Sequence, residues 1–156
     1  MAPDDEDRGP KFAYFLIWGN GLSRQDEIVK EIAKRYRVLV VKEIELDDPE
    51  QFVKTVYRSD WRPHIRDAIT EIKKYVLESE PRVVVVFVIN TQPNETLCND
   101  GWLKCLSFLQ FKKELRQKFN DGNPDAKQHY IHSSDYEYQA IDLLNYLLPD
   151  VLCNAE

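Results

Sequence analysis

The residues best suited to chemistry in this chain are gathered around His129 and His132, two of its three histidines. Residues 129–132 include aromatic and β-branched side chains, which are typical of a strand. Residues 133–135 read Ser-Ser-Asp, which suits the N-cap of a helix predicted over 137–148. His132 is therefore expected where a strand ends and a helix begins, and helix N-termini attract phosphate. The pattern predicts a phosphate site around His132.

A neutral imidazole at His132 could attack a terminal phosphoryl group if positive groups stabilise the charge on its oxygens. One dense basic cluster could supply this charge, in which Arg116 is accompanied by Lys112, Lys113 and Lys118. Three interpretations of His132 stay open: it transfers a phosphoryl group, binds phosphate without turnover, or is a structural histidine. The basic cluster could equally be a solvated helix face.

The two histidines do not predict a metal site. Positions three apart on a strand point to opposite faces of the sheet. Adding Asp135 or a cysteine to His129 and His132 creates no recognised zinc spacing. We therefore predict no metal held by the protein itself. If a nucleotide binds, Mg²⁺ is expected to accompany its phosphates.

Length and charge narrow the class of protein. A chain of 156 residues predicts a single domain, which we place at 11–150. A flexible acidic tail is expected at 1–10 and a C-terminal tail at 151–156. The net charge of −6 argues against a general nucleic-acid surface or an anionic membrane as partner. No apolar run approaches the roughly 20 residues of a membrane helix.

The cysteines and the N-terminus bear on the compartment. Three cysteines without a Cys-x-x-Cys pair predict free thiols in a reducing environment. The acidic N-terminus is also unlike the basic and then apolar start of a signal peptide. Both observations predict a cytoplasmic protein.

Hydrophobic patterning predicts an α/β chain of four strands with intervening helices. The predicted strands are 12–18, 37–46, 82–89 and 129–132, and the predicted helices are 24–36, one beginning at Pro49, 65–77, 102–119 and 137–148. The run at 82–89 (RVVVVFVI) is apolar on both faces, which is typical of a central strand. This order fits a doubly wound parallel sheet, or a ferredoxin-like βαββαβ sheet with an extra helical pair.

Local signals mark turns and helix starts between these elements. Ser23 is the predicted cap of the helix over 24–36, and Asp47-Asp48 precedes a Pro at the first position of the next helix. Residues 90–101 are predicted to form a polar loop. Residues 19–21 (Gly-Asn-Gly) predict a turn, but they fall short of the dinucleotide fingerprint GxGxxG because Arg24 takes its third glycine position.

The C-terminal part of the chain resembles the nucleoside diphosphate kinase family, whose last-strand motif reads Asn-x-x-His-Gly-Ser-Asp. Residues 129–135 read His-Tyr-Ile-His-Ser-Ser-Asp, which puts His132 at the phosphorylated histidine and Ser134 at the matching serine. The family also has an Arg in an Ile-Arg-Gly-Asp-Phe-like stretch. Residues 115–119 (Leu-Arg-Gln-Lys-Phe) look similar and offer Arg116.

The resemblance continues in the N-terminal half. In the family a Tyr followed by Arg-Pro-Phe borders the nucleotide pocket, and Tyr57 with 62–64 (Arg-Pro-His) is similar. Residues 15–21 run like the family's first strand and its Lys-Pro-Asp-Gly turn, with Trp18 in place of the Lys. The resemblance implies a ferredoxin-like sheet with His132 as the catalytic residue. The implied ligand-binding residues are Arg116, His129, Ser134, Tyr57, His64 and Trp18.

Several positions depart from the family's pattern, and they leave two classes of function open. Trp18 replaces a phosphate-binding Lys, His129 a pocket Asn, and Ser133 a Gly. One class is a divergent nucleoside-diphosphate-kinase-like domain that binds a nucleotide or another phosphorylated ligand, with phosphoryl transfer through His132 as its enzymatic form. The other is a degenerate kinase-like module that serves as a protein-interaction domain of a larger protein. The family's hexamers and tetramers also imply a homo-oligomer.

Overall fold

A computed structural model of the protein describes residues 11–58, 69–70, 81–91, 95–97, 103–119, 131–134 and 137–147. Its elements, in chain order, are β1 (Lys11–Ile17), the 3₁₀ helix η2 (Gly19–Arg24), α1 (Gln25–Arg35), β2 (Arg37–Glu45), α2 (Pro49–Tyr57), β3 (Arg82–Asn90), β4 (Glu95–Leu97), β5 (Leu103–Cys105), α4 (Leu106–Phe119), β6 (Ile131–Ser133) and α5 (Glu137–Leu147). The predicted tails, and the predicted helix over 65–77 apart from 69–70, lie outside the described residues.

Four strands form one antiparallel sheet in the order β2-β3-β1-β6. Strands that are joined through a helix, β1 with β2 and β3 with β6, therefore run parallel to each other with one strand between them. This arrangement is the ferredoxin-like split βαβ topology, which confirms that prediction and excludes the doubly wound parallel sheet. The register places Leu16 of β1 opposite His132 of β6.

The valine run of β3 lies in the middle of the sheet, as its composition predicts. Residues 83–88 are at most 1% exposed, because both faces of β3 are covered. β-branched side chains pack well on such a pleated, doubly covered surface. The edge strand β2 instead alternates between half-buried and exposed positions, with Leu39 at an irregularity in its pairing with β3. Sequence patterning thus identified the central strand from its residues alone.

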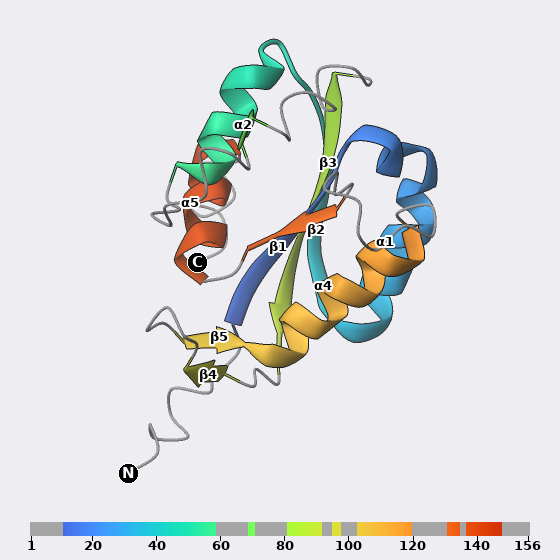
Figure 1. The fold of residues 1–156 in the computed structure, drawn as a ribbon, viewed down its shortest axis with the longest axis vertical. Coiled ribbons are helices and arrows are strands. Elements are labelled where there is room, and N and C mark those ends of the chain that lie inside the picture. The colour runs from blue at the N-terminus through green and yellow to red at the C-terminus, as the bar shows by residue number, and fades with distance from the viewer. Residues whose placement is uncertain are drawn as a thin grey trace.

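Helices cover both faces of the sheet (Figure 1): α1 and α4 on one side, α2 and α5 on the other. Alternate residues of β1 and β3 point into two separate apolar cores. The core under α1 and α4 contains Ala13, Phe15, Ile17, Leu22, Ile28, Ile32, Val84, Val86, Val88, Phe108, Phe111, Leu115, Phe119 and Ile131. The core under α2 and α5 contains Tyr14, Leu16, Trp18, Phe52, Val53, Val56, Tyr57, Val83, Val85, Phe87, Ala140, Leu143 and Leu144.

The two predicted helix starts have different outcomes. The side chain of Asp48 accepts a hydrogen bond from the backbone N–H of Gln51 at 3.1 Å, and Pro49 occupies the first turn of α2, as predicted. The predicted cap Ser23 is wrong, because it lies inside η2 and the residue before α1 is Arg24. The chain turns into η2 through Gly19, whose φ of 58° is in the left-handed region that favours glycine.

A small second sheet corrects two further predictions. The predicted polar loop over 90–101 contains β4, and the predicted helix over 102–119 begins with β5 and becomes helical only at Leu106. β4 and β5 pair antiparallel over three residues each. Three residues are too few to show a period of two, so pairing between the strands decided a structure that local patterning could not indicate.

Candidate phosphate site around His132

His132 lies in the middle of β6, the strand at one edge of the sheet. Side chains alternate along a strand. Ile131 belongs to the core under α1 and α4, so His132 points to the opposite face, toward α2 and α5. The imidazole is half-buried there. The short strand thus orients the histidine through its pairing with β1.

Three aromatic rings surround the imidazole of His132. The ring of Trp18 is stacked on it, with centroids 5.9 Å apart and 19° between the planes. The rings of Tyr57 and Tyr14 are tilted against it, with centroids at 4.9 Å and 5.8 Å. Trp18 is 0% exposed, so it fills the core under α2 and α5. His132 is the polar member of an otherwise aromatic cluster.

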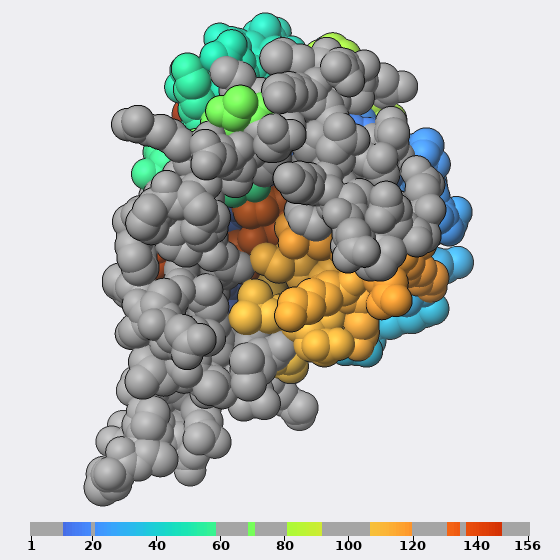
Figure 2. Space-filling view, viewed as in Figure 1, coloured from blue at the N-terminus to red at the C-terminus, as the bar shows by residue number. Residues whose placement is uncertain are grey.

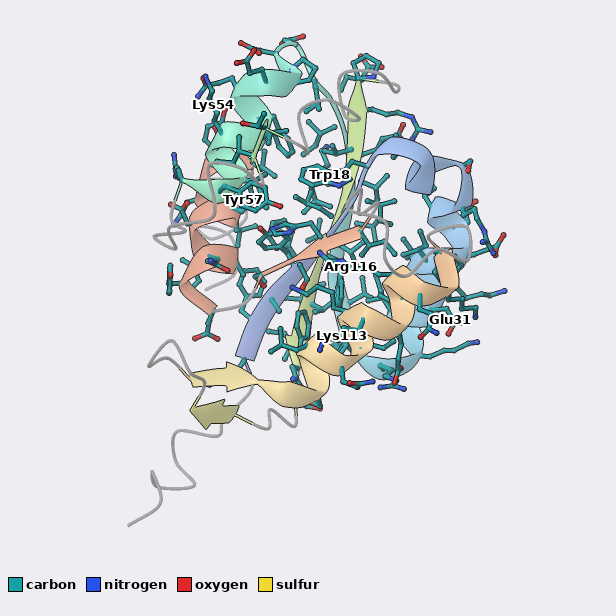
Figure 3. All side chains as sticks on the ribbon, in the orientation of Figure 1. Trp18, Glu31, Lys54, Tyr57, Lys113 and Arg116 are labelled. Atoms are coloured by element: carbon teal, nitrogen blue, oxygen red, sulfur yellow. The ribbon has the colours of Figure 1, made fainter. Side chains whose placement is uncertain are left out.

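Tyr57 also makes a polar contact with His132. Its hydroxyl oxygen lies 3.3 Å from Nδ1 of the imidazole, and the tautomer decides which of the two donates. Figure 3 shows Tyr57 and Trp18 on the side of the sheet that faces α2 and α5. Because a hydrogen bond at one ring nitrogen selects the tautomer, Tyr57 influences which nitrogen of His132 carries the lone pair.

Two side chains extend the pairing of β1 beyond the end of β6. The hydroxyl oxygen of Ser134 accepts a hydrogen bond from the backbone N–H of Tyr14 at 3.1 Å. The backbone N–H of Ser134 donates to the Tyr14 carbonyl at 3.2 Å. The Glu137 carboxylate accepts from the backbone N–H of Phe12 at 2.7 Å. These bonds satisfy backbone groups that a longer β6 would otherwise pair, and they fix the corner between His132 and α5.

The hydroxyl of the neighbouring Ser133 lacks a hydrogen bond of the kind that Ser134 makes among the described residues. Its side chain is 0% exposed, and its hydroxyl has no hydrogen-bond partner among the described residues. Ser133 is on the same face of β6 as Ile131, away from His132. A buried hydroxyl without a partner costs free energy, so Ser133 is a locally unfavourable residue one position after the histidine.

Arg116 reaches β6 from α4, on the other side of the sheet. Its Nε donates to the carbonyl of Ile131, the residue before His132, at 2.8 Å (Figure 3). The members of the predicted basic cluster lie in different surroundings on α4. Lys118 is exposed and pairs with Glu31 of α1 at 3.3 Å, while Lys112 is buried. Hydrogen bonds from Lys34 and Lys118 lower the pKa of the Glu31 carboxyl.

An ion pair joins α2 to α5, the helices on the face of the sheet to which His132 points. Arg58, directly after α2, donates from Nε and Nη2 to the Asp142 carboxylate of α5 at 2.9 and 2.7 Å. The hydrogen bonds to Asp142 raise the pKa of the Arg58 guanidinium. The guanidinium also lies over the Tyr146 ring, 5.5 Å from its centroid. The bidentate contact between Arg58 and Asp142 holds α2, and with it Tyr57, against α5.

A polar pocket of about 470 Å³ lies where η2 meets the start of α1, away from His132. Its lining residues are Leu22, Ser23, Arg24, Gln25, Asp26, Glu27, Glu43 and Arg82. Nη1 of Arg82 donates to Gln25 at 2.7 Å and to Glu43 at 3.1 Å. Arg24 pairs with Glu27 at 2.9 Å. Because these arginines already face carboxylates, the pocket is a weaker candidate for an anion than the surroundings of His132.

The structure brings only part of the predicted site together. His132, Tyr57 and Trp18 are in contact, Ser134 adjoins them through the backbone, and Arg116 binds the strand from the other side. The predicted ligand-binding residues His129 and His64 lie outside the described residues. Sequence reasoning missed Tyr14, and the signal that could have found it was a hydroxyl-bearing aromatic within an otherwise apolar strand.

Comparisons with known proteins identify the fold. The chain is similar to nucleoside diphosphate kinase from Aquifex aeolicus, with 11% identity, 90% of this chain and 96% of that chain covered, and a TM-score of 0.56. It is also similar to the Borrelia burgdorferi enzyme with bound vanadate and ADP, at 14% identity, 91% and 89% coverage and a TM-score of 0.55. The Encephalitozoon cuniculi enzyme is similar at 13% identity, with 88% of each chain covered and a TM-score of 0.51.

These likenesses show that the chain has the fold of nucleoside diphosphate kinases, as the sequence motifs led us to expect. No family model matches the sequence. No curated protein matches it either. Among the described residues, no helix is long and apolar enough to cross a membrane. Within the same residues, no three His, Cys, Asp or Glu side chains form a group that could hold a metal ion.

Proposed function

We propose that the protein binds a nucleotide or another phosphorylated ligand beside His132, and that His132 accepts the phosphoryl group when the ligand is a nucleoside triphosphate. The observation that carries the proposal is the contact between the Tyr57 hydroxyl and Nδ1 of His132 at 3.3 Å. It gives a half-buried imidazole a polar partner within an aromatic cluster, on a strand that resembles the phosphorylated strand of the kinases.

The transfer would proceed as a displacement at phosphorus. A lone pair on an unprotonated nitrogen of His132 forms a P–N bond to the γ-phosphorus while the bond from phosphorus to the β–γ bridging oxygen breaks. The nucleoside diphosphate leaves with the electron pair, and a second diphosphate can later take the phosphoryl group from the histidine. Tyr57 would orient the ring throughout, since its hydroxyl can either donate to or accept from Nδ1.

Mg²⁺ would enter this site with the nucleotide. The side chains around His132 are indole and phenol rings. These are poor ligands for Mg²⁺, which prefers carboxylates, water and phosphate oxygens. The ion would therefore be held by the phosphates, where it neutralises part of their charge.

Binding can be tested with a thermal-shift scan of ATP, ADP, GTP and CDP, with and without Mg²⁺. A ligand at 100 times its Kd stabilises the folded state by about 2.7 kcal/mol, which raises Tm by several degrees. Tyr57→Phe removes only the hydroxyl and should weaken binding about 2- to 10-fold. Tyr146→Phe, an exposed tyrosine on α5, is the matched control and should leave binding unchanged. No shift with any nucleotide would contradict the proposal.

Transfer needs a separate measurement. Incubation with γ-labelled ATP should leave acid-labile, base-stable phosphate on the wild-type chain. His132→Asn should abolish the label, while Tyr146→Phe, at the exposed control position on α5, should retain it. Binding without any label on His132 would leave a ligand-binding domain and refute the transfer step.

A second candidate is the protein-interaction module. It is favoured by Trp18, which is fully buried and stacked on His132 where a phosphate site would benefit from positive charge. It is also favoured by Tyr138, Ile141 and Tyr146, three large side chains exposed on α5. Absence of nucleotide binding together with a defined self-association would support it, and light scattering during size-exclusion chromatography would measure the latter. The cytoplasmic location stays a prediction.

A further inference from the structure

We propose that Lys112 is a further phosphate-binding residue, which acts with Arg116 along the outer edge of β6. This inference rests on the function proposed above and adds a second cation to Arg116, on the α4 side of the edge strand that carries His132. Lys112 is only 9% exposed, although lysine is among the residues least often buried. Its neighbour in the sequence, Lys113, is exposed. The burial singles out one lysine of the basic cluster.

The side chains of α4 are distributed over three directions. The central stripe, Phe108, Phe111, Leu115 and Phe119, packs on the sheet. One flank meets α1, where Glu114 pairs with Arg35 at 3.2 Å and Lys118 pairs with Glu31. The other flank carries Lys112 and Arg116, which are four positions apart and so lie one above the other on the helix. Arg116 shows what this flank faces, because its Nε binds the Ile131 carbonyl of β6.

The direction of α4 sets the position of Lys112 along β6. The helix and the strand run side by side in opposite directions (Figure 1). Four residues back along α4, from Arg116 to Lys112, is about 6 Å. Two residues forward along β6, from Ile131 to Ser133, is about the same length. Lys112 is therefore placed beside the strand at the level of Ser133, with His132 between the levels of the two cations.

The surroundings of this edge also fit an anionic group. The Ser133 hydroxyl, which is buried and has no hydrogen-bond partner among the described residues, lies on the α4 side of β6. In the space-filling view, orange atoms of α4 are exposed on the lower part of the front surface, and darker orange-red atoms from the described part of 131–147 are visible beside them (Figure 2). A phosphate here would meet the ammonium of Lys112 as a point charge and the guanidinium of Arg116 as a planar donor.

The test measures equilibrium binding of ADP, inorganic pyrophosphate and adenosine to the full chain and to two variants. Lys112→Gln should weaken ADP and pyrophosphate about 10- to 100-fold, because a charge-assisted hydrogen bond is lost, and should leave adenosine unchanged. Lys113→Gln, with the same charge change on an exposed neighbour, should alter all three less than threefold. The salt dependence of ADP binding should also be shallower for Lys112→Gln than for Lys113→Gln.

The outcomes separate this inference from the proposed function. If the wild type binds ADP and pyrophosphate but Lys112→Gln and Lys113→Gln behave alike, the role of Lys112 is refuted while the proposed function stands. If the wild type binds none of the three probes, both are refuted. If Lys112→Gln does not fold, Lys112→Met, which keeps the buried aliphatic stem and removes the charge, takes its place with the same expected losses.

Discussion

The two faces of the sheet differ in chemistry although the same strands build both. On the α1 and α4 face, Phe15 packs between the rings of Phe108 and Phe111, with centroids 4.8 and 5.9 Å away. On the α2 and α5 face, the half-buried His132 contacts the Tyr57 hydroxyl among aromatic rings at the edge of the core. One face is a continuous apolar core, and the other combines a core with polar groups at its edge.

The difference shows how an edge strand can support a reactive residue. β1 and β3 are covered on both faces, so a polar side chain in them would need a buried partner. β6 has a paired neighbour only on the β1 side among the described residues, and His132 keeps part of its surface exposed. The apolar face therefore supplies stability, and the edge of the opposite face supplies a place for chemistry.

The largest expected effect is a loss of stability on the α1 and α4 face, and it tests whether this apolar core stabilises the fold. Phe15→Ala removes a side chain that is 0% exposed and should lower the free energy of unfolding by about 3–5 kcal/mol. Urea denaturation measures this loss. Leu39→Ala, at a position 44% exposed on the edge strand β2, is the control and should change stability by less than about 0.5 kcal/mol. A loss below about 1 kcal/mol for Phe15→Ala would show that this core is not well packed.

A pair of adjacent serines sharpens the comparison at the edge of the sheet. Ser134→Ala leaves the buried N–H of Tyr14 without its acceptor and should cost about 1–3 kcal/mol. Ser133→Ala removes a buried hydroxyl that has no partner among the described residues, so stability should stay the same or rise. Thermal unfolding of the two variants side by side measures both. Equal losses would mean that the hydroxyl of Ser133 also has a partner.

The smallest expected effect is a pH-dependent change in stability at Glu31, on the outer surface of α1. Glu31 has a pKa lowered by its hydrogen bonds to Lys34 and Lys118, so its ionised form is favoured in the folded state. This contribution is present above the ordinary glutamate pKa of about 4.3 and is lost as the pH falls through the lowered folded value.

Glu31→Gln should therefore lower Tm slightly at pH 7 and have no effect at a pH below the folded pKa. Unfolding scans from about pH 2 to about pH 7, which bracket the carboxyl pKa, measure this trend. Leu39→Ala, at an exposed position without an ionisable group, is the control and should show no such pH trend. A Tm difference that grows on acidification would have the wrong sign for this ion pair.

Patterning of the sequence was sufficient where a segment carries its own signal. The valine run over 82–89 predicted a central strand because only a strand covered on both faces tolerates so many apolar residues in succession. Asp48 with Pro49 predicted the start of α2 because both the cap and the fixed φ act within one helical turn. The histidine motif and the Arg-containing stretch also led to the correct fold.

Other features depend on contacts between segments far apart in the chain, and the tertiary structure alone decided them. Phe12 and Glu137 are 125 positions apart, Tyr57 and His132 are 75 apart, and no local pattern encodes such a meeting. The pairing of β6 with β1 decided that His132 faces the aromatic core while Ser133 faces the other side. The packing of α4 likewise separated Lys112 from Lys113. Residue types determined which elements form and which chemistry is possible, and strand register and helix packing determined which of those residues meet.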